Sequence, residues 1–162
     1  MKLQFNPCMK HQLIRKSVRQ FAERELAPIA AEIDQHRRFP QEVIAKMRAL
    51  NYFGLQAPVE YGGAALDSIS AAIVVEEISR VCAAVGLCVT VHNGVAVYPM
   101  LKFATPAQKD KYLPGLVSGE TIGAFSLTEA NAGSDAGSVE ATAVWNGSEY
   151  VLNGTKIFVT NG

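Results

Sequence analysis

Apolar residues recur at helical spacing through the first two-thirds of the chain. Between Lys10 and Asp34 they gather on one face, and charged side chains fill most of the other. Pro28 interrupts this pattern, which predicts a kink or a division of the helix. A second helix is predicted from Pro40 to about Asn51, because proline is favoured in the first turn.

A loop over residues 53–66, rich in glycine and proline, separates these helices from a more apolar one. Asp67 is a plausible cap for that helix, which we expect over residues 68–84. Because it is apolar on most sides, it is expected to be buried at the centre of the fold. Gly86 is expected to end this apolar run, and a further helix is predicted over residues 91–103.

The sharpest local pattern lies just before the last predicted helix. Thr105 can cap the helix, Pro106 suits its first turn, and Gln108 stands at the capping-box position. These residues predict a short helix that runs to about Val117 and closes near Gly119.

After residue 120 the apolar spacing changes from a helical period to alternation. Strands are predicted over residues 121–128, 140–145, 149–152 and 156–160. The pairs Asn146-Gly147 and Asn153-Gly154 lie between predicted strands and are typical of two-residue hairpin turns. So few strands leave sheet edges unpaired, so the natural fold is expected to continue past Gly162. The pattern therefore predicts an α+β chain, with an all-α domain over residues 1–119 and a truncated β-domain over residues 120–162.

Composition excludes some classes of function. Fifteen basic residues balance fifteen acidic ones, which argues against a dedicated nucleic-acid binder. Three cysteines do not suggest a disulfide framework, and no Cys or His spacing typical of a metal site occurs. Residues 1–9 lack the apolar run of a signal peptide, and residues 81–103 are interpreted as a buried core segment rather than a membrane span. These features favour the cytoplasm.

The residues themselves point to little chemistry. No nucleophile elbow and neither glycine-rich nucleotide fingerprint is present. Glu76 and Glu77 are adjacent, so they should face different sides of a helix, and Glu76 is expected to pair with Arg80. The small-residue loop after Thr128 could bind a pyrophosphate through backbone N–H groups and the Ser134 hydroxyl, but by itself it is most often an ordinary turn.

Several motifs, taken in order, resemble the acyl-CoA dehydrogenase family. Thr-Glu-x-x-x-Gly-Ser-Asp at 128–135, Tyr-Val-Leu-Asn-Gly-Thr-Lys at 150–156 and Ile-Phe-Val-Thr-Asn-Gly at 157–162 are similar to its middle domain. The N-terminal half agrees at four segments, 21–28, 61–63, 75–78 and 102–109. The resemblance implies a helical N-terminal domain followed by the first strands of a β-barrel-like middle domain. A C-terminal four-helix bundle completes the family fold.

The resemblance also implies an FAD site. Residues expected to line the pyrimidine edge of the flavin are Phe125, Ser126, Leu127 and Thr128. Gly133 and Ser134 should bind near the FAD pyrophosphate, with Ser134 also facing the acyl-CoA. The flavin ring should be flanked by Phe158, Val159 and Thr160. Position 158 is often Trp in the family, and phenylalanine keeps the apolar ring face there, whereas position 125 is often Tyr, so a phenol is lost.

The implied activity is the oxidation of acyl-CoA thioesters to trans-2-enoyl-CoA, a step of fatty acid metabolism. Tyr98 is expected near the acyl chain, and the overall pattern leans towards short-chain, butyryl-type members. Electron-transfer flavoprotein is the implied partner and a homotetramer the implied assembly. The family's base is a carboxylate, most often from the C-terminal domain, so no catalytic residue is assigned here and this chain alone is expected to be inactive. The alternative is a non-catalytic helical module that binds a partner.

Overall fold

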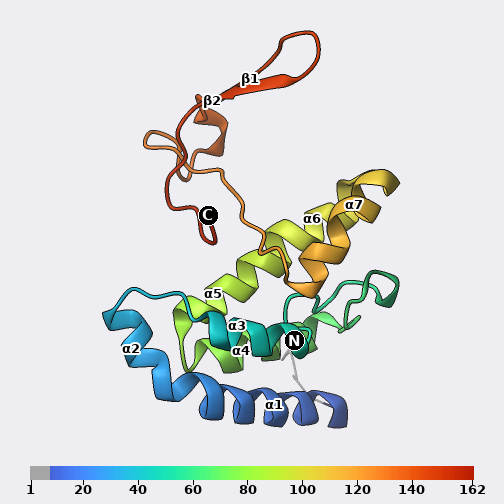
Figure 1. Cartoon of the computed structure of the whole chain (residues 1–162), viewed down its shortest axis with the longest axis vertical. Coiled ribbons are helices and arrows are strands. Elements are labelled where there is room, and N and C mark those ends of the chain that lie inside the picture. Colours follow the sequence, from blue (N-terminus) through green and yellow to red (C-terminus); the bar gives the residue numbers. More distant parts are fainter. Residues whose placement is uncertain (1–7) are drawn as a thin grey trace, which may run out of the picture.

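The computed structural model describes residues 8–162. A helical body carries the chain up to residue 120, and an arm with one β-hairpin rises from it (Figure 1). The α-helices are α1 (Met9–Phe21), α2 (Ala30–Gln35), α3 (Gln41–Ala49), α4 (Ser68–Ser79), α5 (Ala83–Val91), α6 (Tyr98–Phe103) and α7 (Pro106–Ser118). The strands are β1 (Thr142–Trp145) and β2 (Tyr150–Asn153). Most of the stretch used for the signal-peptide expectation, residues 1–7, lies outside the described residues.

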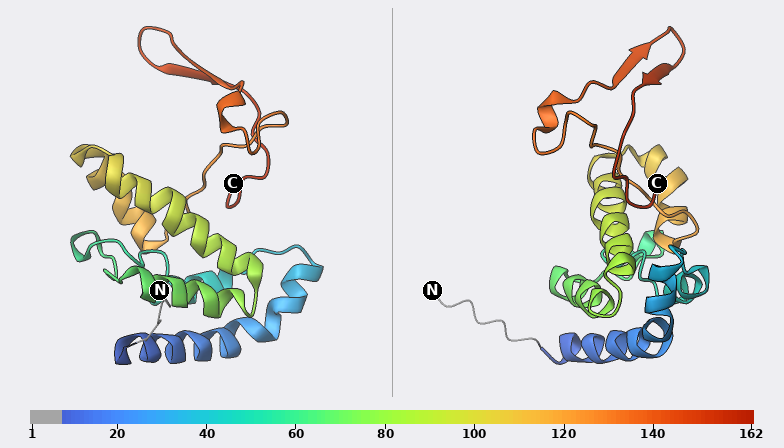
Figure 2. Two further views of the ribbon diagram at one scale, coloured as in Figure 1. Left: turned by 180° about the vertical axis from the view of Figure 1, so that it is seen from behind. Right: turned by 90° about the vertical axis from the view of Figure 1, so that its left-hand side faces the viewer.

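The first helical run bends where proline predicts it. Between α1 and α2 the backbone is π-helical over Ala22–Leu26 and 3-10 helical over Ala27–Ile29. Pro28 lies in the 3-10 turn, where it has no N–H to donate and its ring disfavours a regular α-turn. As a result α2 turns away from the axis of α1 (Figure 2), and the predicted kink is confirmed.

Helix α4 forms the centre of the helical body, as its apolar composition predicts. It packs between α1 and α5. Its first turn is capped by Asp67, whose Oδ1 accepts a hydrogen bond of 2.8 Å from the Ser70 N–H. Ile73, Val74 and Ile78 of α4 are buried. The helix ends at Ser79, five residues before the predicted end.

The predicted break at Gly86 is wrong. From Ala83 to Phe103 the chain is helical without interruption, through α5, a π-helical segment over His92–Val97, and α6. The break comes earlier, between α4 and α5. A Cβ at position 86 would lie 1.9 Å from Ser79 Oγ and 2.9 Å from Ser79 Cα. Gly86 therefore allows α4 and α5 to approach closely, a role that helical periodicity cannot reveal.

Adding a methyl group at position 86 is expected to destabilise the helical body. The Gly86→Ala variant should lower the free energy of unfolding by about 1–3 kcal/mol, because its Cβ forces α4 and α5 apart. Gly94→Ala is the matched control, since a Cβ at position 94 would meet no neighbouring atom within 4 Å. There alanine should raise stability by up to about 1 kcal/mol. Urea unfolding followed by circular dichroism measures both, and equal effects would contradict the close approach.

Within the described residues, one helical run is long and apolar enough to cross a membrane by length and composition. It is Ala83–Phe103, and a third of its most apolar window is buried inside the molecule. The run packs against α4 and α7, and it contains the buried imidazole of His92. These contacts join the run to the helical body, as the interpretation from sequence expects, but most of its most apolar window is not buried.

The arm holds less regular structure than the alternating pattern predicts. β1 and β2 pair antiparallel, with Trp145 opposite Tyr150. Their loop has four residues, 146–149, rather than the predicted two, because Asn146 Oδ1 accepts hydrogen bonds from the Ser148 and Glu149 N–H groups. The strands predicted at 121–128 and 156–160 are absent, because a single backbone hydrogen bond, from the Ile157 N–H to the Thr128 carbonyl, joins these segments in the described structure, and one bond does not make a ladder.

Candidate functional site

Two arm segments that lie far apart in sequence run side by side. The Ile157 N–H donates to the Thr128 carbonyl at 2.8 Å, and Lys156 Nζ donates to the Leu127 carbonyl at 2.9 Å. These two bonds bring residues 125–128 next to residues 158–160. The residues expected at the pyrimidine edge of a flavin therefore adjoin those expected at its ring.

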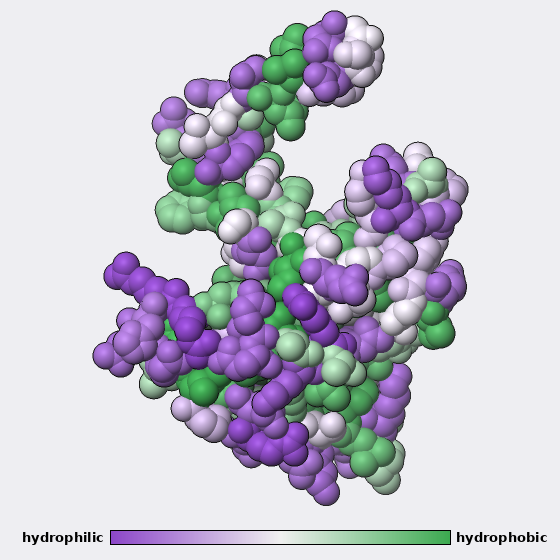
Figure 3. All heavy atoms as spheres, in the orientation of Figure 1, coloured by the Kyte–Doolittle hydropathy of each residue, from purple (hydrophilic) through white to green (hydrophobic). Residues whose placement is uncertain are grey.

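The two segments present uncovered apolar side chains beside polar groups. Phe158 is 89% exposed, and Phe125 and Leu127 are also exposed, whereas Thr128 and Thr160 are half-buried. Phe158 has a φ of +56°, a left-handed backbone conformation that is uncommon for phenylalanine and typical of functional sites. Apolar surface lies near the base of the arm (Figure 3). A flat aromatic ring with hydrogen-bonding edges fits this combination.

The small-residue loop is held by Asp135. Its Oδ1 accepts a hydrogen bond from the Gly137 N–H, and its Oδ2 accepts one from the Ser138 hydroxyl. Gly133 and Ser134 lie just before this turn and are exposed. Nothing in the described part of the chain bonds to the Ser134 hydroxyl. The hydroxyl is therefore available to a ligand.

Glu129 holds the two ends of the same loop together through hydrogen bonds, and the sequence did not predict this role. Its carboxylate accepts hydrogen bonds from the Glu140 N–H at 2.6 Å, the Ala141 N–H at 3.0 Å and Lys156 Nζ at 2.6 Å. The lysine and these backbone donors lower the pKa of Glu129 to about 2. The group is thus a buried anchor between the loop and the segment that leads to Phe158. The only signal for this role in the sequence is the position of Glu129, directly before a loop of small residues.

Tyr98, the other residue expected to contact substrate, lies apart from the loop residues. It is exposed on α6, with Lys102 Nζ 5.8 Å from its ring centre. A groove of about 500 Å³ runs between α6, α7 and residues 123–125, and its walls include Ala96, Met100 and Phe125. Tyr98 does not line this groove. Phe125 instead shares this groove with Met100 of α6 and Ala96 of the π-helical segment.

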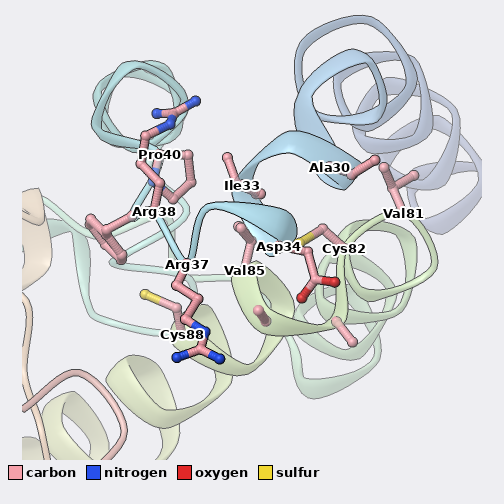
Figure 4. Close-up of a pocket in the computed structure, with 14 residues that line it drawn as sticks. Ala30, Ile33, Asp34, Arg37, Arg38, Pro40, Val81, Cys82, Val85 and Cys88 are labelled. Carbon is pink, nitrogen blue, oxygen red and sulfur yellow. The ribbon is translucent and has the colours of Figure 1, made fainter.

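A further pocket lies away from these segments. It has a volume of about 510 Å³ between α2 and the start of α5, with apolar walls and Arg37 and Arg38 at its edge (Figure 4). Arg38 is engaged by Glu32 and Glu42. Burial raises the pKa of Cys88 to about 11, so its thiol stays protonated at neutral pH. Among the described residues, no group of three or more His, Cys, Asp or Glu side chains could hold a metal ion.

Comparison with known proteins identifies both parts of the chain. Residues 9–120 match the acyl-CoA dehydrogenase N-terminal domain, and residues 124–162 match the acyl-CoA dehydrogenase middle domain. A short-chain-specific acyl-CoA dehydrogenase of Clostridium acetobutylicum is 46% identical over 160 residues, which are 99% of this chain and 42% of the relative. The chain thus spans less than half the length of that relative.

Solved structures agree with the sequence matches. A chain in a structure of the electron-transferring flavoprotein of Acidaminococcus fermentans superposes with a TM-score of 0.92 and 39% identity, over 99% of this chain and 42% of that one. An acyl-CoA dehydrogenase of Bacillus anthracis, in complex with FAD, superposes with a TM-score of 0.87 and 35% identity, over 94% and 27%. The helical body, the opening of the middle domain and the sequence identity all lead to one conclusion: the chain belongs to the acyl-CoA dehydrogenase family.

Proposed function

We propose that this chain is part of an FAD-dependent enzyme that oxidises acyl-CoA thioesters to trans-2-enoyl-CoA. One observation carries the proposal most directly. Residues 125–128 and 158–160 lie side by side and leave apolar rings and polar edges uncovered. The proposed division at residue 119/120 separates the helical body from this site. The two family matches, which meet near this point, support it.

The proposed flavin contacts follow from this arrangement. Phe125, Ser126, Leu127 and Thr128 would lie along the pyrimidine edge, and Phe158, Val159 and Thr160 would flank the ring. Gly133 and Ser134 would bind the pyrophosphate, because their loop is exposed and the Ser134 hydroxyl is free to donate. When bound, FAD supplies the acceptor for the hydride that leaves the β carbon. The chain's own residues hold that acceptor and exclude water from one side of it.

Substrate and partners are proposed on the family resemblance. Ser134 and Tyr98 would contact the acyl-CoA, and a short acyl chain is favoured because the Clostridium acetobutylicum relative is short-chain specific. Electron-transfer flavoprotein would reoxidise the enzyme, and the assembly would be a homotetramer in the cytoplasm. The second candidate is a non-catalytic helical module. The self-contained core that α1, α3, α4 and α5 share favours it.

Loss of one threonine hydroxyl is expected to weaken FAD binding measurably. The test uses the complete product of the reading frame that encodes this chain. Thr160→Val keeps the side-chain shape but removes the donor, and one such hydrogen bond contributes about 0.5–1.5 kcal/mol, or about 2- to 12-fold in affinity. Thr155→Val, at an exposed position in the same segment, is the control. FAD titration followed by flavin fluorescence checks both, and unchanged affinity for Thr160→Val would remove this residue from the site. A complete product that binds no FAD would favour the helical module.

A further inference from the structure

His92 makes three hydrogen bonds that fix its protonation state. The imidazole is fully buried at the start of the π-helical segment. Nε2 lies 2.9 Å from the Leu116 carbonyl and 3.1 Å from the Phe53 carbonyl, so it must carry the proton. Nδ1 lies 2.9 Å from the Gly123 backbone nitrogen, so it must accept from that N–H. His92 therefore has one neutral tautomer, and burial lowers its pKa.

Gly123 is the point where three parts of the molecule meet. Its N–H binds His92, and its carbonyl accepts a hydrogen bond of 3.2 Å from Asn161 Nδ2. Asn161 Nδ2 also donates to the Cys88 carbonyl of α5 at 3.1 Å. A Cβ on residue 123 would lie 2.4 Å from the Cβ of Ala96, so only glycine fits. We call His92, Gly123 and Asn161 the junction triad.

The junction triad adjoins both segments of the proposed flavin site. Gly123 is two residues from Phe125, and Asn161 directly follows Thr160. The bonds of Ile157 and Lys156 hold the two segments together at their other end. Each segment is thus fastened twice, once to the other segment and once to the helical body. Without the junction triad, the arm would lose the described hydrogen bonds that orient it on α5 and the π-helical segment.

We propose that the junction triad is a positioning device that sets both flavin-binding segments against the helical body. His92 acts through Gly123, because its Nδ1 atom accepts the hydrogen bond from the Gly123 N–H. The flavin part of this inference rests on the proposed function. A merely structural histidine would act through its Nε2 contacts to Phe53 and Leu116, which hold the helical body together.

Two substitutions separate the two nitrogen atoms of His92. In His92→Asn the amide oxygen stands near the Nδ1 position and can still accept from Gly123, but the Nε2 donor is lost. In His92→Gln the amide NH₂ can reach the Nε2 position and still donate to Leu116, but the Nδ1 acceptor is lost. Amide hydrogen exchange at Gly123 is measured by NMR on the 162-residue chain, together with its thermal midpoint.

The proposal predicts opposite outcomes for the pair. His92→Gln should speed exchange at Gly123 by about tenfold while the thermal midpoint falls little, and His92→Asn should keep Gly123 protected while the midpoint falls more. Equal exchange at Gly123 in both variants would overturn the proposal. Asn161→Gly serves if neither histidine variant folds. Glycine tolerates the φ of +67° at this position, so exchange at Gly123, which is distant in sequence from the added glycine, reports the lost side-chain bonds, and unchanged exchange there would overturn the proposal.

A second readout links the junction triad to the flavin. In the complete product of the reading frame, His92→Gln should weaken FAD binding about tenfold, whereas the separate variant His92→Asn should keep most of the wild-type affinity. Equal FAD affinity in the two variants, with Gly123 exchange changed, would show that the triad does not position the flavin segments. Failure of the unmodified protein to bind FAD would instead contradict the proposed function. The exchange result at Gly123 would stand in that case.

Discussion

Replacing Glu77 by glutamine is expected to lower the free energy of unfolding by about 3 kcal/mol. The Glu77 side chain lies on α4 and is only 1% exposed. It accepts hydrogen bonds from Arg15 and Arg19 of α1, the latter at 2.8 Å from both Nε and Nη2. Glutamine keeps the size but removes the buried counter-charge, so Arg19 loses its carboxylate partner and Arg15 keeps only the exposed Glu76. The loss falls at the lower end for buried pairs because both arginines are partly exposed.

The control for this substitution is the neighbouring residue. Glu76 pairs with Arg15 at 2.8 Å but is 60% exposed, so Glu76→Gln should cost less than about 1 kcal/mol. Urea unfolding at pH 7 measures both variants. If both substitutions lowered the free energy of unfolding equally, the buried Glu77 network would not be the main link between α1 and α4.

The same network sets a pH dependence. Hydrogen bonds from Arg19 and Arg15 lower the pKa of Glu77 from 4.5 to about 2. Because the folded pKa is depressed, the unfolded chain binds the proton more readily, and stability is complete above about pH 4.5. It is then lost as the pH falls towards 2. The Glu77→Gln variant should lack this part of the acid dependence.

No bleaching of flavin is expected when the 162-residue chain is mixed with FAD and butyryl-CoA. General-base help contributes about 10²- to 10⁴-fold to such a proton abstraction, and Glu129, the carboxylate beside the proposed site, is not suited to provide it. Glu129 has a pKa of about 2 and three hydrogen-bond donors on its oxygens. Asp135 is engaged in its own turn, and Glu149 lies in the hairpin loop.

Anaerobic absorbance at the flavin band is the measurement. The complete product of the reading frame, treated in the same way, is the positive control for substrate and flavin. Stoichiometric bleaching by the 162-residue chain would contradict the expectation and would assign a base within these residues. Glu129→Gln would then be the first variant to examine, since Glu129 adjoins Thr128 of the proposed site.

Local physics allowed much of the fold to be predicted from the sequence. The reciprocal bonds between Thr105 and Gln108, the cap at Asp67 and the bend at Pro28 depend on residues within one helical turn, so a linear pattern determines them. The hairpin of β1 and β2 is also local, and its loop length and strand ends differ from the prediction by one or two residues. The resemblance to the family likewise came from contiguous motifs, and the comparisons confirm it.

Contacts between distant segments decided the rest. Glu76 and Glu77 are the same residue type at adjacent positions, and only the packing of α1 on α4 buries Glu77. Arg80, the predicted partner of Glu76, binds Glu23 and Glu77 instead. Residues 121–128 alternate like a strand, yet a strand requires a neighbouring strand. His92 is an isolated histidine in the sequence, and its role depends on carbonyls 24 and 39 residues away. Burial and hydrogen-bond partners are properties of the assembled chain, so the sequence determined the helices and the family, whereas the tertiary structure decided which side chains hold the site together.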